Sequence, residues 1–230
     1  MITVKKHAIK YKDSDGTMKD SGVLCQVGTF GVDWFPYMNI FENAFKRVVF
    51  PKNTEITLNI GKEGWIPQNV TQYSLQSIFA NTTGVTKVVL KGNPENVLLK
   101  FRYAFESSED LEEVDISGLN LIVQDFLCAF NVCKKLKRII GELDFSNATH
   151  INSMFSSCIA LEEVRFKSES LFTTLQIPHT SVLSDESIQS IINGLATVEE
   201  SQTIAFHVNV KAKLTEEQIA TITSKNWTLA

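Results

Sequence analysis

The chain has 230 residues, of which 43% are hydrophobic and 21% are charged, and its formal net charge is −4. This composition provides enough apolar material for one extended core or two compact ones. The acidic balance gives no electrostatic basis for binding nucleic acid or an anionic membrane surface. No apolar run approaches the roughly 20 residues that span a bilayer, so we expect no membrane insertion.

Residues 1–40 are expected to form a β-rich N-terminal arm or cap. Tyr11–Met18 predicts two short strands joined by a turn at Asp15 and Gly16. Charged and apolar positions alternate over residues 1–13, without the apolar core of a secretory signal peptide. We therefore expect a virion-associated or cytoplasmic location unless a signal was removed.

A cluster of aromatic residues follows the predicted hairpin. Its members are Trp34, Phe35, Tyr37 and Phe41. They either seal the first coil of the repeats that follow or form an attachment patch. We favour sealing, because the end of a stack of repeats must be covered.

The repeat region is expected to span residues 41–183 and to begin with degenerate coils. An apolar alternation typical of a strand occupies Ile56, Leu58 and Ile60. The spacing of the second half of a repeat occurs at Phe45, Val48 and Phe50.

A pattern that begins with phenylalanine recurs four times, at a period of 25 or 26 residues. The phenylalanines are Phe79, Phe105, Phe130 and Phe155, and the apolar residues six positions later are Val85, Leu111, Leu136 and Leu161. A fixed period of this length is typical of a solenoid, in which no unit buries its apolar face alone and each stacks on its neighbours. We expect both sets of residues to form ladders through the core.

Each coil is expected to add one short strand to a parallel sheet. Pairs of β-favouring residues predict strands at Val88–Leu90, Val114–Ile116, Ile139–Ile140 and Val164–Phe166. The stretches before the phenylalanines, such as Tyr73–Ile78, predict a short helical turn or 3₁₀ segment. The expected fold is an α/β, right-handed, non-globular stack.

Charged residues recur at equivalent positions and alternate in sign. The series eight positions after each phenylalanine is Lys87, Glu113, Arg138 and Glu163, and the series seven positions after it is Thr86, Glu112, Lys137 and Glu162. In stacked coils each charge lies beside an opposite one, and such a pair contributes roughly 0.2–1 kcal/mol. The adjacent carboxylates Glu112–Glu113 and Glu162–Glu163 are also consistent with a pair of catalytic acids. We interpret them instead as solvated charges that fix the register of the coils.

The four cysteines show neither a Cys-x-x-Cys motif nor a histidine at metal-ligand spacing. They are Cys25, Cys128, Cys133 and Cys158. The last two come three positions after a phenylalanine, where the other copies have Thr82 and Ser108. We interpret this slot as a place for a small, weakly polar side chain rather than a redox or metal site, and expect reduced thiols.

The segment Met154–Phe166 resembles the BspA-type leucine-rich repeat, with Phe, a small residue or Cys, Leu and Val in that order. The copies at Phe130 and Phe105 match nearly as well. The first copy is the weakest, with Gly84 and Val85 where a polar residue and Leu are usual.

The resemblance covers about residues 73–180, with the clear repeats at 79–180. It implies a right-handed, leucine-rich-repeat-type solenoid whose surface serves non-enzymatic recognition on bacterial cell-surface and phage-related proteins. The asparagine ladder of ordinary leucine-rich repeats is absent, so a horseshoe is not implied.

Residues 184–230 are expected to form a C-terminal α/β cap. Ser184 predicts the N-cap of a helix. The apolar face of this helix comprises Ile188, Ile191, Ile192 and Leu195. A strand is predicted at Gln202–His207.

A capping box at Thr215–Gln218 predicts a second helix, with Ile219 and Ile222 facing inward. Asn226 is expected to end it in a left-handed turn before a last strand. This tail resembles segments that follow such repeats in phage and phage-derived bacterial proteins, where glycine usually holds the place of Asn226.

Three classes of function remain open. The favoured one is a recognition module that binds a protein or cell-surface glycan through the repeat surface, with contact residues that the sequence does not identify. The second is a structural or assembly component of a phage tail, docked through the aromatic cluster. The third is a hydrolytic enzyme, but the four histidines share no motif and no phosphate loop or nucleophile elbow occurs. We predict no catalytic residue, no cofactor and no metal site.

Overall fold

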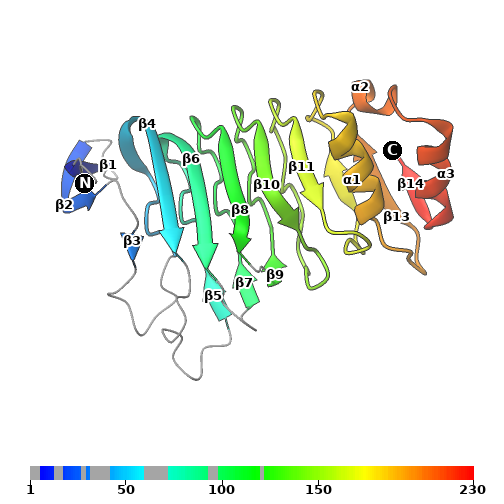
Figure 1. The fold of residues 1–230 in the computed structure, drawn as a ribbon, viewed down its shortest axis with the longest axis horizontal. Helices are drawn as coiled ribbons and strands as arrows, with labels where there is room; N and C mark the ends of the chain where they lie inside the picture. Colours follow the sequence, from blue (N-terminus) through cyan, green and yellow to red (C-terminus); the bar gives the residue numbers. More distant parts are fainter. Residues whose placement is uncertain are drawn as a thin grey trace.

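A computed structural model shows a row of strands with helices at its C-terminal end (Figure 1). The structure describes residues 42–59, 72–92, 98–119 and 122–230. It also describes the backbone of β1 (Lys6–Lys12), β2 (Met18–Gln26) and β3 (Phe30–Gly31). The aromatic cluster Trp34, Phe35, Tyr37 and Phe41, the Asp15–Gly16 turn and Ile60 lie outside the described residues.

Parallel strands laid side by side in chain order form the body of the protein (Figure 1). They are β4 (Val48–Asn59), β6 (Thr83–Gly92), β8 (Glu113–Leu119), β10 (Arg138–Leu143) and β11 (Glu163–Phe166). The antiparallel hairpin β1–β2 and the short β3 both join at β4, which gives an eight-stranded sheet. The strands predicted in the four repeats are confirmed, and so are the two strands of the N-terminal hairpin.

A second parallel sheet lies in the connections between these strands. It consists of β5 (Gln72–Ser74), β7 (Leu98–Lys100) and β9 (Ile122–Asp125). Each of the three connections from β4 to β10 contains one of its strands. The repeat pattern does not predict this sheet.

The predicted phenylalanine ladder forms the centre of the core. The ring centroids of Phe79 and Phe105 lie 5.5 Å apart, those of Phe105 and Phe130 5.4 Å, and those of Phe130 and Phe155 5.6 Å, with interplanar angles of 9°, 2° and 12°. Phe45 extends the stack at 5.2 Å from Phe79. The predicted aliphatic ladder is buried beside it. Offset stacking at this spacing is favourable beyond the area that it buries.

Neither the helical turn nor the 3₁₀ segment predicted before each phenylalanine forms. Instead, the residues two before and two after each phenylalanine have left-handed backbone: Ser77, Asn81, Tyr103, Ser107, Cys128, Val132, Ser153 and Ser157. A left-handed residue interrupts a helix within one turn. Successive amides donate alternately to the next coil and within their own turn. Phe79 N–H donates to Ala104 O of the next coil at 2.8 Å, and Ala80 N–H donates to Ser77 O at 3.2 Å. The segment thus satisfies its buried backbone by stacking, as buried amides require.

The departure of the first repeat copy from the pattern has a steric cause. Gly84 has φ +83°, and a Cβ added there would lie 2.1 Å from the carbonyl oxygen of Phe50. Only glycine has both the backbone freedom and the space for this approach.

The C-terminal segment packs a helix and a third parallel sheet against the end of the row. Helix α1 (Asp185–Gly194) is N-capped by Ser184 and buries Ile188, Ile191 and Ile192, as predicted. The sheet comprises β12 (Leu175–Ile177), β13 (Gln202–Phe206) and β14 (Trp227–Leu229). The predicted strand at Gln202 is confirmed, but it ends one residue early because His207 N-caps the short helix α2 (Val208–Lys211), which was not anticipated.

Helix α3 (Glu216–Ser224) opens with the predicted capping box, in which Thr215 and Gln218 exchange side-chain and backbone hydrogen bonds. Asn226 has φ +64° and ends the turn as predicted. The prediction that Ile219 faces inward was wrong. Ile219 is 40% exposed, whereas Ile222 is 1% exposed. Helix α3 lies at the outer end of the row (Figure 1), and Ile222 is the buried residue of this helix.

The described residues therefore form an α/β protein with a parallel sheet, few helices and no closed barrel. None of the helices described has both the length and the apolar character needed to cross a membrane.

Candidate functional site

The outward face of the large sheet presents side chains in rows that run across the strands. Inward residues such as Val114 and Ile116 are buried, and the residues between them point away from the core. One row follows the strand register Glu55, Lys87, Glu113, Arg138, Glu163. The predicted alternation of sign is therefore present in space, and it extends one strand further, to Glu55.

Glu113 is the centre of this row. Its Oε1 lies 2.6 Å from Lys87 Nζ, and its Oε2 accepts a hydrogen bond from Arg138 Nε at 2.5 Å. The Lys87 ammonium, supported by Arg138, holds the pKa of Glu113 below its ordinary value of 4.5, although burial opposes this. A carboxylate that stays ionised in this way stabilises the strand register and is a poor general acid.

Similar pairs follow the turns that precede the strands. Lys137 Nζ lies 2.8 Å from Glu112 Oε2, and Lys135 Nζ lies 2.8 Å from Asp110 Oδ1. Asp110 also accepts the N–H of Gly84 at 2.8 Å, and the Lys135 bond is the main reason why its pKa is lowered. These contacts join three consecutive coils.

The charge ladder stops one coil earlier than predicted. In the part of the chain that the structure describes, neither Glu162 nor Glu163 forms a side-chain ion pair. Arg138 is already bonded to Glu113 on its other side. The pairing of β10 with β11 also shifts register between Arg138 and Glu142, around Gly141 with φ +101°.

The same end of the sheet carries a hollow of about 490 Å³ beside α1. Residues 139–142 of β10, residues 163–165 of β11, and Ser184, Glu186 and Ser187 at the start of α1 line it. The sequence identifies no contact residues. Nothing in the repeat pattern indicates this hollow, because it arises where a helix replaces the next strand.

Helix α1 closes the hydrogen-bonding edge of β11. Val164 N–H donates to Ser187 Oγ and Phe166 N–H donates to Ser190 Oγ, both at 3.0 Å. Ser187 Oγ donates in turn to Glu162 O at 3.0 Å. Two serines one turn apart thus satisfy the strand amides that another strand would otherwise pair.

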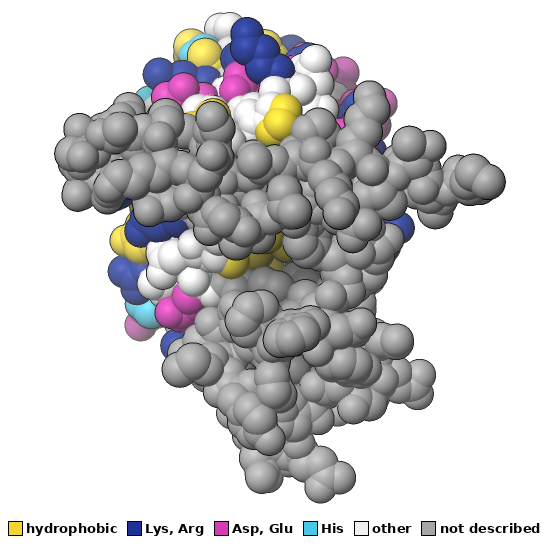
Figure 2. Space-filling model, turned by 90° about the vertical axis from the view of Figure 1, so that its left-hand side faces the viewer, with side chains coloured by type: hydrophobic (Ala, Val, Ile, Leu, Met, Phe, Trp, Pro, Cys, Tyr) yellow, Lys and Arg dark blue, Asp and Glu magenta, His cyan; other side chains and the backbone are white. Residues whose placement is uncertain are grey.

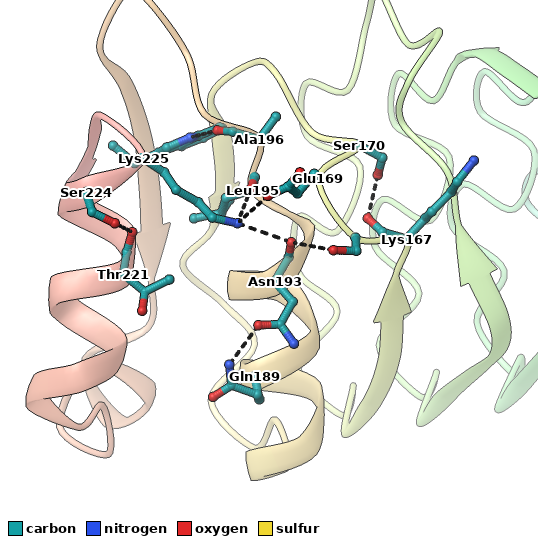
Figure 3. Close-up of polar contacts among 12 residues, drawn as sticks. Lys167, Glu169, Ser170, Gln189, Asn193, Leu195, Ala196, Thr221, Ser224 and Lys225 are labelled. Atoms are coloured by element: carbon teal, nitrogen blue, oxygen red, sulfur yellow. Dashed lines mark hydrogen bonds and ion pairs between the residues drawn. The ribbon is translucent and has the colours of Figure 1, made fainter.

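The other end of α1 is fixed by Lys225, which extends from the end of α3 (Figure 3). Its Nζ donates to Leu195 O at 2.6 Å and to Asn193 O at 3.4 Å, and lies 3.9 Å from Glu169 Oε1. A cation at the carbonyl end of a helix is stabilising. The wall of the hollow is therefore held at both ends.

The cysteine slot has a definite structural role. Cys133 Sγ donates to Phe105 O at 2.9 Å, and Cys158 Sγ donates to Phe130 O at 3.0 Å. Ser108 makes the same bond to Phe79 O at 2.8 Å. Burial raises the pKa of Cys158 to about 12, so its thiol is protonated and unreactive at neutral pH. Cys128, Cys133 and Cys158 carry free thiols, and the Cys25 side chain lies outside the described residues.

The histidines whose side chains are described are far apart and serve local structure. His179 Nδ1 accepts the N–H of Ser157 at 3.3 Å, where the inner coils use a backbone carbonyl. His207 Nδ1 accepts the N–H of Asn209 at 3.1 Å and caps α2. Across residues 42–58, 74–91, 100–119 and 122–230, no three His, Cys, Asp or Glu side chains are grouped so that they could hold a metal ion.

Figure 2 looks at the molecule from the N-terminal side of the row. On the part of this view whose residues are described, Lys and Arg side chains lie beside Asp and Glu side chains. The described part of this view therefore carries charges of both signs.

Comparison of the chain with protein-family models, with curated proteins and with solved structures gives no match.

Proposed function

We propose that the chain is a non-enzymatic recognition module, built as a right-handed solenoid of the BspA leucine-rich-repeat type, that binds a protein or cell-surface glycan through the outward face of its large sheet. The observation that carries this proposal is the strand register, which aligns outward side chains of successive strands into rows. Right-handed crossovers are the rule for parallel strands of one sheet, which supports the handedness.

The outward face has the character of a contact surface as well as a regular shape. The row next to the charged one runs Thr57, Val89, Asp115 and Ile140. It mixes apolar and polar side chains, and Ile140 is 37% exposed. Such positions vary independently of the buried ladders, because the core is formed by the alternate residues of the same strands. A cell-surface or phage-related setting follows from the family resemblance alone.

The proposal is tested by incubating the purified chain with bacterial cells and with a glycan array. We expect retention by a bacterial surface or by a defined glycan. The double variant Val89→Ser/Ile140→Ser should bind more weakly, because it removes apolar contact area from the centre of the face.

Val208→Ser is the matched control, since Val208 is 69% exposed on α2, away from the sheet face. It should bind as the unmodified chain does. An equal loss of binding in the double variant and in Val208→Ser would indicate that the contact surface is not on the sheet. Failure to bind any cell or glycan, combined with assembly onto phage tail proteins, would favour the structural role instead. Turnover of ester, glycoside or phosphate substrates would favour the enzyme.

A further inference from the structure

The hollow between β10, β11 and α1 contains unpaired negative charge. Its lining includes three carboxylates, from Glu142, Glu163 and Glu186, and one cation, Arg165. All four side chains are exposed, and none forms a hydrogen bond or ion pair with another described residue.

Four other carboxylates behave differently. The carboxylates of Asp110, Glu112, Glu113 and Asp144 each contact a lysine or arginine of a neighbouring coil. In the hollow the strand register still places Glu142 beside Arg165 and Glu163 beside Arg138, but these neighbours form no ion pair. The lining holds three carboxylates and one guanidinium, which is an excess of negative charge. An excess of one sign inside a concave surface raises the local concentration of the opposite charge.

The floor of the hollow is partly apolar. Ile140 is 37% exposed, on a strand whose alternate residues point into the core. Lysine and arginine side chains pack their aliphatic stems on apolar surface while the charged head stays with polar partners. The volume of about 490 Å³ lies within the roughly 300–1,000 Å³ of pockets that enclose small ligands, so one such side chain and its flanking backbone fit.

The edge of β11 offers no alternative mode of peptide binding. The amides on this edge, those of Val164 and Phe166, already donate hydrogen bonds to the hydroxyls of Ser187 and Ser190. A partner strand therefore finds no open edge here. A ligand at this place has to engage through its side chains.

We propose that this hollow binds a lysine or arginine side chain of a protein partner. The inference rests on the proposed recognition function and names the chemistry of the partner. The carboxylates hold the cationic head, and Ile140 packs against its aliphatic stem. Sulfated, phosphorylated or sialylated glycans are disfavoured, because the same carboxylates repel their charges.

The test is selection from an immobilised library of random peptides with blocked ends, followed by titration of the selected peptide. We expect selected sequences to contain Lys or Arg at a recurring position. Glu142→Gln, Glu163→Gln and Glu186→Gln should each weaken binding by about two- to fivefold, as expected for exposed charge pairs. Arg165→Gln should tighten it by a similar factor, since it removes a like charge.

Glu162→Gln is the matched control. Glu162 is an exposed glutamate next to Glu163, but it does not line the hollow. Its substitution should leave the affinity for the selected peptide unchanged, and every variant should retain the thermal midpoint of the unmodified chain.

Selection of peptides without basic residues, or no selection at all, would overturn the inference. So would an affinity that the three hollow substitutions leave unchanged, or one that Arg165→Gln weakens. Retention of the unmodified chain by cells or by a glycan, with hollow variants retained equally well, would leave the recognition function standing and remove only the basic-side-chain site. Loss of cell, glycan and peptide binding together would remove both.

Discussion

Val164 N–H donates to Ser187 Oγ at 3.0 Å, so a helix side chain pairs the backbone of the last strand in the large sheet. In the preceding coils this position is paired by the next strand. Ser190 repeats the arrangement at Phe166 one turn later. The repeat region therefore ends in closed hydrogen bonding, and an open edge that could pair with another chain is avoided.

Ser187→Ala should destabilise the protein by about 1–3 kcal/mol, because it leaves the buried N–H of Val164 without an acceptor. Urea unfolding followed by circular dichroism measures this. Ser201→Ala is the control, since Ser201 is exposed and, among the described residues, its hydroxyl contacts only the hydroxyl of Thr228. Equal stability of both variants would contradict the role given to Ser187.

Phe130→Ala should cost about 3–5 kcal/mol, because a buried aromatic ring is lost and the stack leaves a cavity. Phe130 is 0% exposed and lies between Phe105 and Phe155. The free energy of unfolding in urea is the measurement. Phe172→Ala, at a ring that is 53% exposed, should change it little, and a similar loss at both positions would argue against the ladder as the core.

Val132→Asn should stabilise the protein by about 1 kcal/mol, since it relieves a β-branched residue from left-handed backbone. Val132 has φ +61°, and Asn81 holds the equivalent position two coils earlier. A rise in the thermal midpoint is the expected result. Val182→Asn is the control, because Val182 is an exposed valine without left-handed backbone. A higher thermal midpoint for this variant and none for Val132→Asn would refute backbone strain at Val132.

Glu113→Gln should lower the free energy of unfolding at neutral pH by about 1 kcal/mol, as expected for a partly screened ion pair. The folded pKa of Glu113 is lowered, so its contribution is complete above the ordinary value of 4.5 and is lost as the pH falls through the folded pKa. The variant and the unmodified chain should therefore converge in acid. Glu112→Gln, at a more exposed carboxylate with one lysine partner, should show a smaller difference.

Cys133→Ser/Cys158→Ser should fold normally, because Ser108 already makes the same bond to a phenylalanine carbonyl. Burial raises the folded pKa of Cys158 from 9.0 to about 12. Its contribution to stability is thus complete below pH 9 and declines as the pH rises toward 12. As the pH rises from 9 toward 12, the free energy of unfolding should therefore fall less in the double variant than in the unmodified chain, as measured by urea denaturation. Rapid labelling of both native thiols by iodoacetamide at neutral pH would contradict their burial.

Features that depend on periodicity and local chemistry follow from the sequence alone. The spacing of Phe79, Phe105, Phe130 and Phe155 predicted the stacked core, since side chains at a fixed period meet when coils stack. Ser184 and the Thr215–Gln218 box predicted two helix starts, because capping is decided by neighbouring residues.

Tertiary structure decided what depends on neighbours distant in the chain. The turns beside each phenylalanine are left-handed because their amides bond to the next coil, which no local propensity reveals. Gly84 departs from the repeat pattern because the carbonyl oxygen of Phe50 occupies the space that a Cβ at this position would need. The charge ladder ends at Arg138, whose Nε bonds to Glu113 on one side, while no ion pair joins it to Glu163 on the other. The hollow exists because α1, and not another strand, covers β11.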